Sequence, residues 1–298
     1  MNERIPGTSE RMRGKREGVD LPGNRGLFTK NTKVRLENIM DRKWAVVTGA
    51  SSGIGEKFAE KLAAKGYNLV IAARRAGRLE KLCRKIRTRC KNECLPVTVD
   101  LSTKEGCLYL YDRIEKLDVE VFINNAGFGE CDRFTETDLD RELEMIDLNI
   151  KAVHILTKLM VKKFCSVNRG YLLNVGSSAG LFPAGPFMAA YYASKAYVNS
   201  LTRAVAEELE RRGSRIYVGC LCPGPVDTEF NGVANVRFAL KGISADRCAG
   251  YALRRMFRRE TLIVPGVSIK AAALGARLLP QKLIIRLTGN QQRRKLGK

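Results

Sequence analysis

Strands and helices are expected to alternate along most of this chain from residue 43 onward. Short apolar runs that predict strands lie at 43–50, 67–74, 94–101, 120–127, 170–177 and 216–224. The segments between several of them carry apolar residues at helical spacing. Alternation of this kind is typical of βαβ units, in which parallel strands form one sheet and helices cover both faces. The sequence therefore predicts an α/β fold with a doubly wound parallel sheet, whose ligands bind beyond the carboxyl ends of the strands.

A glycine-rich turn joins the first predicted strand to the helix that follows it. Gly49, Gly53 and Gly55 have the spacing G-x-x-x-G-x-G. Residues without a Cβ let backbone N–H groups approach a pyrophosphate at the start of a helix. Ser51 and Ser52 can add hydroxyl donors. The turn therefore predicts a dinucleotide site, and a tight turn without a ligand is the alternative.

The end of the second predicted strand discriminates between the two nicotinamide cofactors. An acidic residue there binds the ribose 2′-hydroxyl, whereas an arginine accommodates a 2′-phosphate. The chain has Arg74 and Arg75 at this point and no acid before Glu80. The planar guanidinium group suits phosphate oxygens. NADP(H) is therefore the favoured cofactor, and a solvated start to a basic helix is the alternative.

Five motifs then occur in a fixed order. They are TGASSGIG (48–55), NNAG (124–127), NVGSSAG (174–180), YYASK (191–195) and PGPVDT (223–228). Together they resemble the short-chain dehydrogenase/reductase family. The residues of the motifs are similar to those of a bacterial branch of the family whose substrates are mostly unassigned. The resemblance implies a single-domain Rossmann-like fold with about seven parallel strands. It also implies hydride transfer between a nicotinamide and an alcohol or carbonyl, and a homodimer or homotetramer.

The candidate cofactor-binding residues follow from the motifs and the resemblance together. They are Gly49, Ser51, Ser52, Gly53, Ile54 and Gly55 for the pyrophosphate, Arg74 and Arg75 for the 2′-phosphate, Asp100 and Leu101 for the adenine, Asn125, Ala126 and Gly127 at the central strand end, Tyr191 and Lys195 beside the nicotinamide ribose, and Pro223, Gly224, Val226 and Thr228 for the carboxamide.

Tyr191 and Lys195 are spaced four residues apart and so share one face of a helix. A nearby ammonium group is expected to stabilise the phenolate and to lower the pKa of Tyr191, which suits a general acid. In the resemblance Tyr191 is that acid, Lys195 tunes it, Ser177 binds the substrate oxygen and Asn149 holds a water molecule. These four residues are the candidate catalytic set.

Two details of this set stay open. The motif N-x-x-S selects Ser177, whereas the usual family interval before the tyrosine selects Ser178. We favour Ser177, because the proline- and glycine-rich loop at 181–188 can absorb one residue. Tyr192 and Tyr197 lack the geometry of Tyr191 and are expected to pack.

The net charge of +22 is concentrated at the two ends of the chain. Residues 231–298 carry fifteen Lys or Arg against two acids, and residues 1–43 carry eleven against six. We expect a basic, largely disordered tail over 1–40, a dinucleotide-binding catalytic domain over 41–258, and a basic amphipathic extension over 259–298. Basic ends favour an anionic partner. The extension fits a membrane-surface helix or a dimer-packing or lid helix, and nucleic acid is the least favoured partner.

Composition limits the remaining possibilities. The nine cysteines are scattered, form no C-x-x-C pair and accompany a single histidine, so we expect reduced thiols and no metal site. No apolar run of about 18 residues predicts a spanning helix, and residues 1–28 contain no apolar signal segment. A cytoplasmic protein, with or without peripheral membrane contact, is expected.

The sequence thus favours an NADP(H)-dependent oxidoreductase that acts on a ketone or secondary alcohol. The substrate is expected to be apolar, such as a 3-oxoacyl group or another lipid-like carbonyl, free or linked to coenzyme A or an acyl carrier. The alternative is an NADP(H)-sensing interaction protein whose basic ends bind a partner or a membrane surface.

Overall fold

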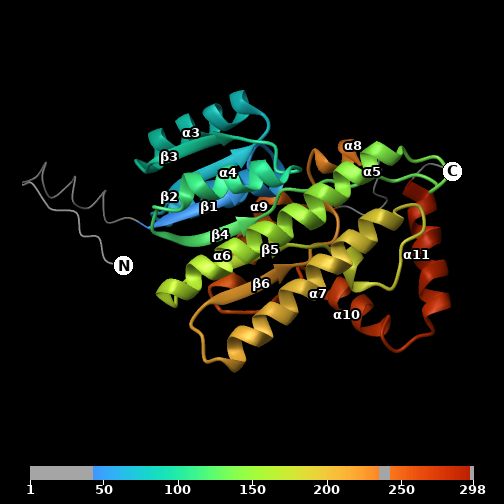
Figure 1. Ribbon diagram of the computed structural model, residues 1–298. Coiled ribbons are helices and arrows are strands. Elements are labelled where there is room, and N and C mark those ends of the chain that lie inside the picture. Colours follow the sequence, from blue (N-terminus) through green and yellow to red (C-terminus); the bar gives the residue numbers. More distant parts are fainter. Residues whose placement is uncertain (1–42, 235–241, 296–298) are drawn as a thin grey trace, which may run out of the picture. The chain divides into compact units, whose positions relative to one another are not determined.

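The computed structural model describes residues 43–234 and 242–295. A sheet of seven parallel strands has the order β3-β2-β1-β4-β5-β6-β9 (Figure 1). Its strands are β1 Trp44–Thr48, β2 Asn68–Ala73, β3 Cys94–Thr98, β4 Val119–Asn124, β5 Tyr171–Val175, β6 Tyr217–Leu221 and β9 Leu262–Ile263. Two short strands, β7 Val226–Asp227 and β8 Ile243–Ser244, pair separately. The predicted doubly wound parallel sheet is confirmed.

Helices fill the connections between the strands. They are α2 Gly53–Ala64, α3 Ala76–Cys90, α4 Lys104–Ile114, α5 Leu139–Ile146, α6 Val153–Val167, α7 Ala189–Arg211, α8 Phe230–Val233, α9 Ala245–Met256, α10 Val267–Gly275 and α11 Gln281–Lys295. A π-helical segment, η1 Asp147–Ala152, joins α5 to α6, and a 3₁₀ turn, η2 Ser178–Leu181, follows β5.

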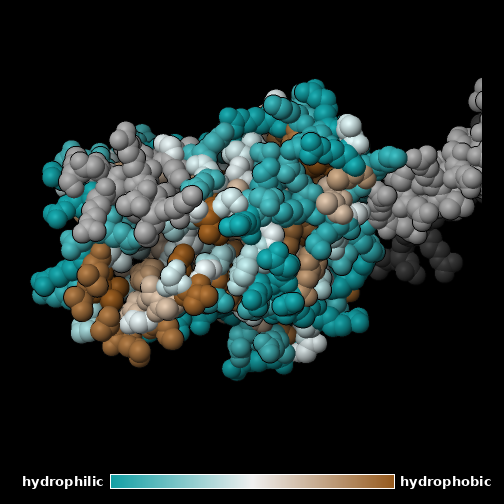
Figure 2. All heavy atoms as spheres, turned by 180° about the vertical axis from the view of Figure 1, so that it is seen from behind, coloured by the Kyte–Doolittle hydropathy of each residue, from teal (hydrophilic) through white to brown (hydrophobic). Residues whose placement is uncertain are grey.

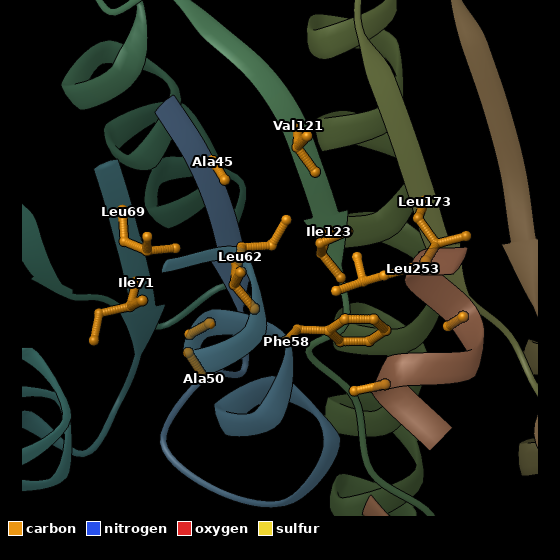
Figure 3. Packing of buried hydrophobic residues seen from close by; sticks show 14 of the residues in the cluster. Ala45, Ala50, Phe58, Leu62, Leu69, Ile71, Val121, Ile123, Leu173 and Leu253 are labelled. Atoms are coloured by element: carbon orange, nitrogen blue, oxygen red, sulfur yellow. The ribbon is translucent and has the colours of Figure 1, made fainter. Parts of the chain in front are cut away.

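Two apolar cores form, one on each face of the sheet. Helices α2, α3 and α9 pack on one face, where Phe58 and Leu62 lie among strand residues such as Ile123 (Figure 3). Helices α4, α6 and α7 pack on the other, around Phe122 and Phe164. Because both faces are covered, the central strands read as continuous apolar runs. This packing fixes the carboxyl ends of the strands, where the candidate site lies.

The sheet continues past the expected end of the catalytic domain at residue 258. Strand β9 pairs in parallel with β6, through Cys220 with Leu262 and Leu221 with Ile263. The predicted extension over 259–298 therefore begins inside the sheet, and α10 and α11 follow it. The expected tail over 1–40 lies outside the described residues. In the part of the chain described here, no helix is long and apolar enough to cross a bilayer.

Candidate active site

Tyr191 and Lys195 lie on the first two turns of α7, and both side chains are buried. The Lys195 Nζ atom lies 5.9 Å from the centre of the Tyr191 ring. It donates a hydrogen bond of 3.0 Å to the main-chain oxygen of Val175, the last residue of β5. The helix therefore brings the two predicted catalytic residues to the carboxyl end of a central strand.

Ser177 is the serine that meets Tyr191. A hydrogen bond joins the two side chains and lowers the pKa of the phenol. The Ser177 hydroxyl also accepts from the main-chain N–H of Ala179 at 3.1 Å. Asn199, one helical turn after Lys195, donates through Nδ2 to the main-chain oxygen of Ser177 at 3.2 Å. Ser177, the serine that the N-x-x-S motif selects, is thus the one whose side chain contacts Tyr191. Sequence reasoning overlooked Asn199, whose signal was a polar residue on the buried face of α7.

Burial dominates the protonation of the pair. It raises the pKa of Tyr191 to about 12, although the hydrogen bond with Ser177 lowers it. It lowers the pKa of Lys195 to about 8 from the usual 10.5, although Cys220 and Cys222 raise it. The expected net lowering of the Tyr191 pKa is therefore not seen, because burial of the phenol is the largest influence on it. Tyr191 is therefore a protonated acid at neutral pH.

Asn149 lies in the π-helical segment η1, between α5 and α6. Its Nδ2 donates to the Phe128 oxygen at 2.8 Å and to Ser194 Oγ at 3.2 Å, and its Oδ1 accepts from the Phe128 N–H at 3.1 Å. A Cβ at Gly127 would lie 2.7 Å from Asn149 Oδ1 and 3.4 Å from Lys195 Nζ. Single π-helical turns are frequent at functional sites. This one carries Asn149 into the neighbourhood of Lys195.

The predicted phosphate loop has the backbone geometry expected of a phosphate-binding turn. Gly49 and Gly53 have positive φ angles of 64° and 59°, which favour glycine. A Cβ at Gly55 would lie 2.3 Å from the Gly49 oxygen, and one at Gly53 would lie 3.2 Å from Thr228 Cγ2. Ile54 and Gly55 form the first turn of α2, whose leading N–H groups have no partner within the helix. The loop therefore fits a pyrophosphate at a helix N-terminus.

Thr48, at the end of β1, ties this loop to the end of β4. Its Oγ1 accepts from the N–H groups of Asn125 at 2.8 Å and Ala126 at 3.0 Å, and Asn125 Nδ2 donates to the Thr48 oxygen at 2.9 Å. Asn125 and Ala126 are thereby held against the glycine turn. Thr48 was not predicted, although a threonine that closes an apolar strand is a visible signal.

The two arginines at the end of β2 both meet acidic side chains from distant segments. Arg74 Nη1 donates to Glu144 Oε1 of α5 at 2.6 Å. Arg75 donates to Ser51 Oγ at 2.9 Å, to Ser52 Oγ at 2.7 Å and, through Nη1, to Glu229 Oε2 at 2.9 Å. Arg75 therefore bridges the phosphate loop and a loop that follows β6.

Asp100 and Leu101 follow β3 at the neighbouring strand end. Asp100 Oδ1 accepts from the N–H of Ser102 at 3.0 Å and from its hydroxyl at 2.8 Å. Leu101 is buried. This strand end lies beside that of β2, because Ala73 pairs with Thr98. The predicted adenine residues and the predicted 2′-phosphate residues thus share one edge of the sheet.

The loop after β6 closes the other side of the site. The main-chain oxygen of Pro223 accepts from the Ser178 N–H at 2.9 Å. A Cβ at Gly224 would lie 2.0 Å from Ile269 Cδ1 of α10. Val226 lies in β7 and is buried. Thr228 faces Gly53, as described above. The four predicted residues therefore lie on one loop, and Thr228 brings this loop against the glycine turn.

A small cleft opens next to Tyr191. It is lined by residues that include Glu130, Phe134, Met145, Phe187 and Met188. Burial raises the pKa of the Glu130 carboxyl, and sequence reasoning did not identify this residue. The lining combines apolar side chains with the carboxylates of Glu130, Asp132 and Glu142.

The other two tyrosines of the motif differ from each other. Tyr192 is buried, as expected, and its hydroxyl accepts from Gln292 Nε2 of α11 at 2.6 Å. Tyr197 is 37% exposed, and its hydroxyl lies 2.7 Å from Nδ1 of His154. The single histidine of the chain, His154, thus lies at the surface and pairs with Tyr197. Over 43–234 and 242–295, three or more His, Cys, Asp or Glu side chains nowhere gather as a metal-binding group.

The comparisons with known proteins agree with this geometry. The family model described as "short chain dehydrogenase" matches residues 43–237. The chain belongs to the short-chain dehydrogenase family. The predicted family is therefore confirmed, and its motifs coincide with the strand ends described above.

A curated relative is the very-long-chain 3-oxoacyl-CoA reductase of Pyrenophora tritici-repentis, 36% identical over 184 residues, which are 60% of this chain and 53% of that one. The chain thus spans about half the length of this relative. A short-chain dehydrogenase from Sphingobium yanoikuyae in complex with NADPH is 30% identical, with a TM-score of 0.72 over 79% of this chain and 94% of that one. A family member from Burkholderia phymatum in complex with NAD is 26% identical, with a TM-score of 0.71 over 79% and 93%. A nicotinamide dinucleotide is therefore the cofactor class of its structural neighbours.

Proposed function

We propose that this protein is an NADP(H)-dependent oxidoreductase that reduces the ketone of an apolar, acyl-thioester substrate. The observation that carries the proposal is the convergence of Tyr191, Lys195 and Ser177 on one strand end, beside a loop shaped for a pyrophosphate. The alternative of a cofactor-sensing interaction protein is not favoured, because a sensor has no need of this catalytic set.

The cofactor would be held by three groups of residues. The N–H groups of the turn from Gly49 to Gly55 would bind the pyrophosphate, Arg74 and Arg75 the 2′-phosphate, and the loop around Thr228 the carboxamide. When bound, the nicotinamide would supply the hydride for reduction. NADP(H) rather than NAD(H) is proposed because two guanidinium groups follow β2.

The protein side of the reaction is proton delivery. Ser177 would orient the substrate carbonyl by donating a hydrogen bond to its oxygen. Tyr191 would then donate its phenolic proton to that oxygen as the alcohol forms. The phenol is protonated at neutral pH, so the proton is in place before the carbonyl is reduced. Lys195, through its positive charge, would stabilise the phenolate that is left behind. Asn149 would hold a water molecule that returns a proton through Lys195.

The substrate class rests on the cleft and the relatives. Phe134, Met145 and Met188 form an apolar part of the cleft lining, beside the carboxylates of Glu130, Asp132 and Glu142. The curated relative is named as a very-long-chain 3-oxoacyl-CoA reductase. The basic C-terminal segment, with no Asp or Glu after Glu260, suits the phosphates of coenzyme A or an acidic carrier. A 3-oxoacyl thioester is therefore the proposed substrate.

We also propose that α10 and α11 contact an anionic membrane surface. Val267, Leu274, Leu278 and Leu287 on this segment are each more than half exposed, and Figure 2 shows a brown apolar area on the side where Figure 1 places these helices. Lysines and arginines interleave with them, which favours anionic lipid. The other face of α11 contacts the loop at 181–188, because Thr288 Oγ1 donates to the Ala184 oxygen at 2.9 Å. A homodimer or homotetramer remains the expected assembly.

Turnover tests the proposed function. The purified protein is mixed with NADPH and a series of 3-oxoacyl-CoA thioesters of increasing chain length, and the loss of NADPH absorbance is followed. We expect kcat/KM to rise with chain length and to be higher with NADPH than with NADH. Reduction of other apolar ketones but of no thioester would reject the acyl class. The absence of turnover on any ketone would reject the oxidoreductase.

A further inference from the structure

Glu229 lies in the chain between Thr228, which contacts the glycine turn, and Phe230, which contacts Tyr191. Its carboxylate accepts from Arg75 Nη1 at 2.9 Å and from Arg78 Nη1 at 2.6 and 2.7 Å. Both arginines belong to the start of α3, one at its N-cap and one in its first turn. Hydrogen bonds from Arg78 and then Arg75 hold the pKa of Glu229 below its usual range. Glu229 is therefore an anion bound by two guanidinium groups at the edge where a 2′-phosphate is proposed to bind.

The same guanidinium group reaches the phosphate loop. Arg75 donates to the hydroxyls of Ser51 and Ser52 while it pairs with Glu229. A carboxylate and a phosphate monoester present similar oxygen acceptors to an arginine. Any phosphate that used these N–H groups would have to take them from Glu229.

The residues on either side of Glu229 face the reaction. Thr228 lies against Gly53, where a Cβ would be 3.2 Å from Thr228 Cγ2. The ring of Phe230 lies 5.7 Å from that of Tyr191, centre to centre. Three consecutive residues thus touch the proposed 2′-phosphate pocket, the glycine turn and the general acid. A change in the partner of Glu229 would therefore take place one residue from the contact with the glycine turn and one residue from the contact with Tyr191.

We infer that Glu229 is a specificity-determining residue that competes with the cofactor 2′-phosphate for Arg75 and Arg78. This inference rests on the proposed use of NADP(H). The phosphate carries more charge and more oxygens than the carboxylate, so it displaces Glu229, and the displaced carboxylate then faces the phosphate as a like charge. NADH has no 2′-phosphate and leaves the pair intact. Glu229 therefore weakens NADPH binding and narrows the preference for NADPH over NADH.

Cofactor titrations of Glu229→Gln test the inference. The substitution keeps the size of the side chain and removes its charge. Followed by cofactor fluorescence, we expect the Kd for NADPH to fall by about three- to tenfold and the Kd for NADH to stay within about twofold. The matched control is Glu207→Gln, which removes the same charge from an exposed pair with Arg211 on α7 and should change neither Kd.

A second variant links the effect to the arginines. In an Arg75→Ala/Arg78→Ala background, Glu229→Gln should tighten NADPH binding by less than in the parent, because the competition for the arginines is gone and only the like-charge repulsion remains. Equal tightening of NADPH and NADH, no change, or weaker NADPH binding in the single variant would each overturn the inference. Failure of the proposed function would look different, because the parent protein itself would then bind neither cofactor.

Discussion

Lys195 Nζ donates a hydrogen bond to the main-chain oxygen of Val175 at 3.0 Å in a position where the side chain is 4% exposed. A lysine buried this deeply loses solvation that one hydrogen bond to a neutral carbonyl does not replace. Its pKa falls to about 8 for this reason. The proposed reaction needs this lysine in its charged form, and keeping it charged is therefore expected to destabilise the folded protein.

Lys195→Met should make the protein more stable and inactive. The unfolded pKa is near 10.5 and the folded pKa is about 8, so below pH 8 the buried charge destabilises the fold by about 3 kcal/mol. The gain in melting temperature should be largest below pH 8. It should shrink as pH rises from 8 to 10.5, because the folded lysine is then neutral and the cost of removing its proton on folding falls as the pH approaches the unfolded pKa. Thermal unfolding of both proteins across this pH range, without cofactor, checks the prediction, and a lower melting temperature in the variant at pH 7 would contradict it.

Arg74→Ala should weaken NADPH binding by about ten- to a hundredfold and leave NADH binding unchanged. The reason is the loss of charge-assisted hydrogen bonds to the 2′-phosphate. Fluorescence titration of each cofactor measures both values. Arg84→Ala is the matched control, because Arg84 is an exposed arginine on α3, the helix that follows Arg74 in the chain. If the two variants behave alike, Arg74 does not bind the 2′-phosphate.

The parent protein should sediment with vesicles of phosphatidylcholine that contain phosphatidylserine, and less so as salt is raised. Leu278→Glu should reduce this binding several-fold, because Leu278 is 81% exposed on the apolar segment. Leu139→Glu, at a 67% exposed leucine of α5, is the control and should not. Binding that is equal in both variants would contradict membrane contact. An oligomer that dissociates in Leu278→Glu would instead assign this face to subunit contact.

What could be predicted from the sequence depended on how far apart the partners lie along the chain. Tyr191 and Lys195 were predictable because helix geometry brings together residues four positions apart. The glycine turn was predictable because its strand and helix adjoin it. Both follow from local periodicity and from the order of the motifs.

Contacts between distant segments could not be predicted in this way. Glu229 reaches Arg75 across 154 positions and Gln292 reaches Tyr192 across 100. No local pattern links such pairs, because only the packing of the sheet and helices brings them together. The pKa of Tyr191 was misjudged for the same reason, since the burial that raises it comes from the whole cluster around the cleft, including Phe128 and Met145.

The most direct test of the account is Tyr191→Phe, measured for NADPH binding and for NADPH-dependent reduction of a long-chain 3-oxoacyl-CoA. The account predicts that the Kd for NADPH stays within about twofold while kcat falls by about a hundredfold or more, because only the phenolic hydroxyl that donates the proton has been removed. Tyr192→Phe, which removes the neighbouring hydroxyl bound by Gln292, should keep its turnover. Turnover that survives in Tyr191→Phe would contradict the account, because another group would then deliver the proton.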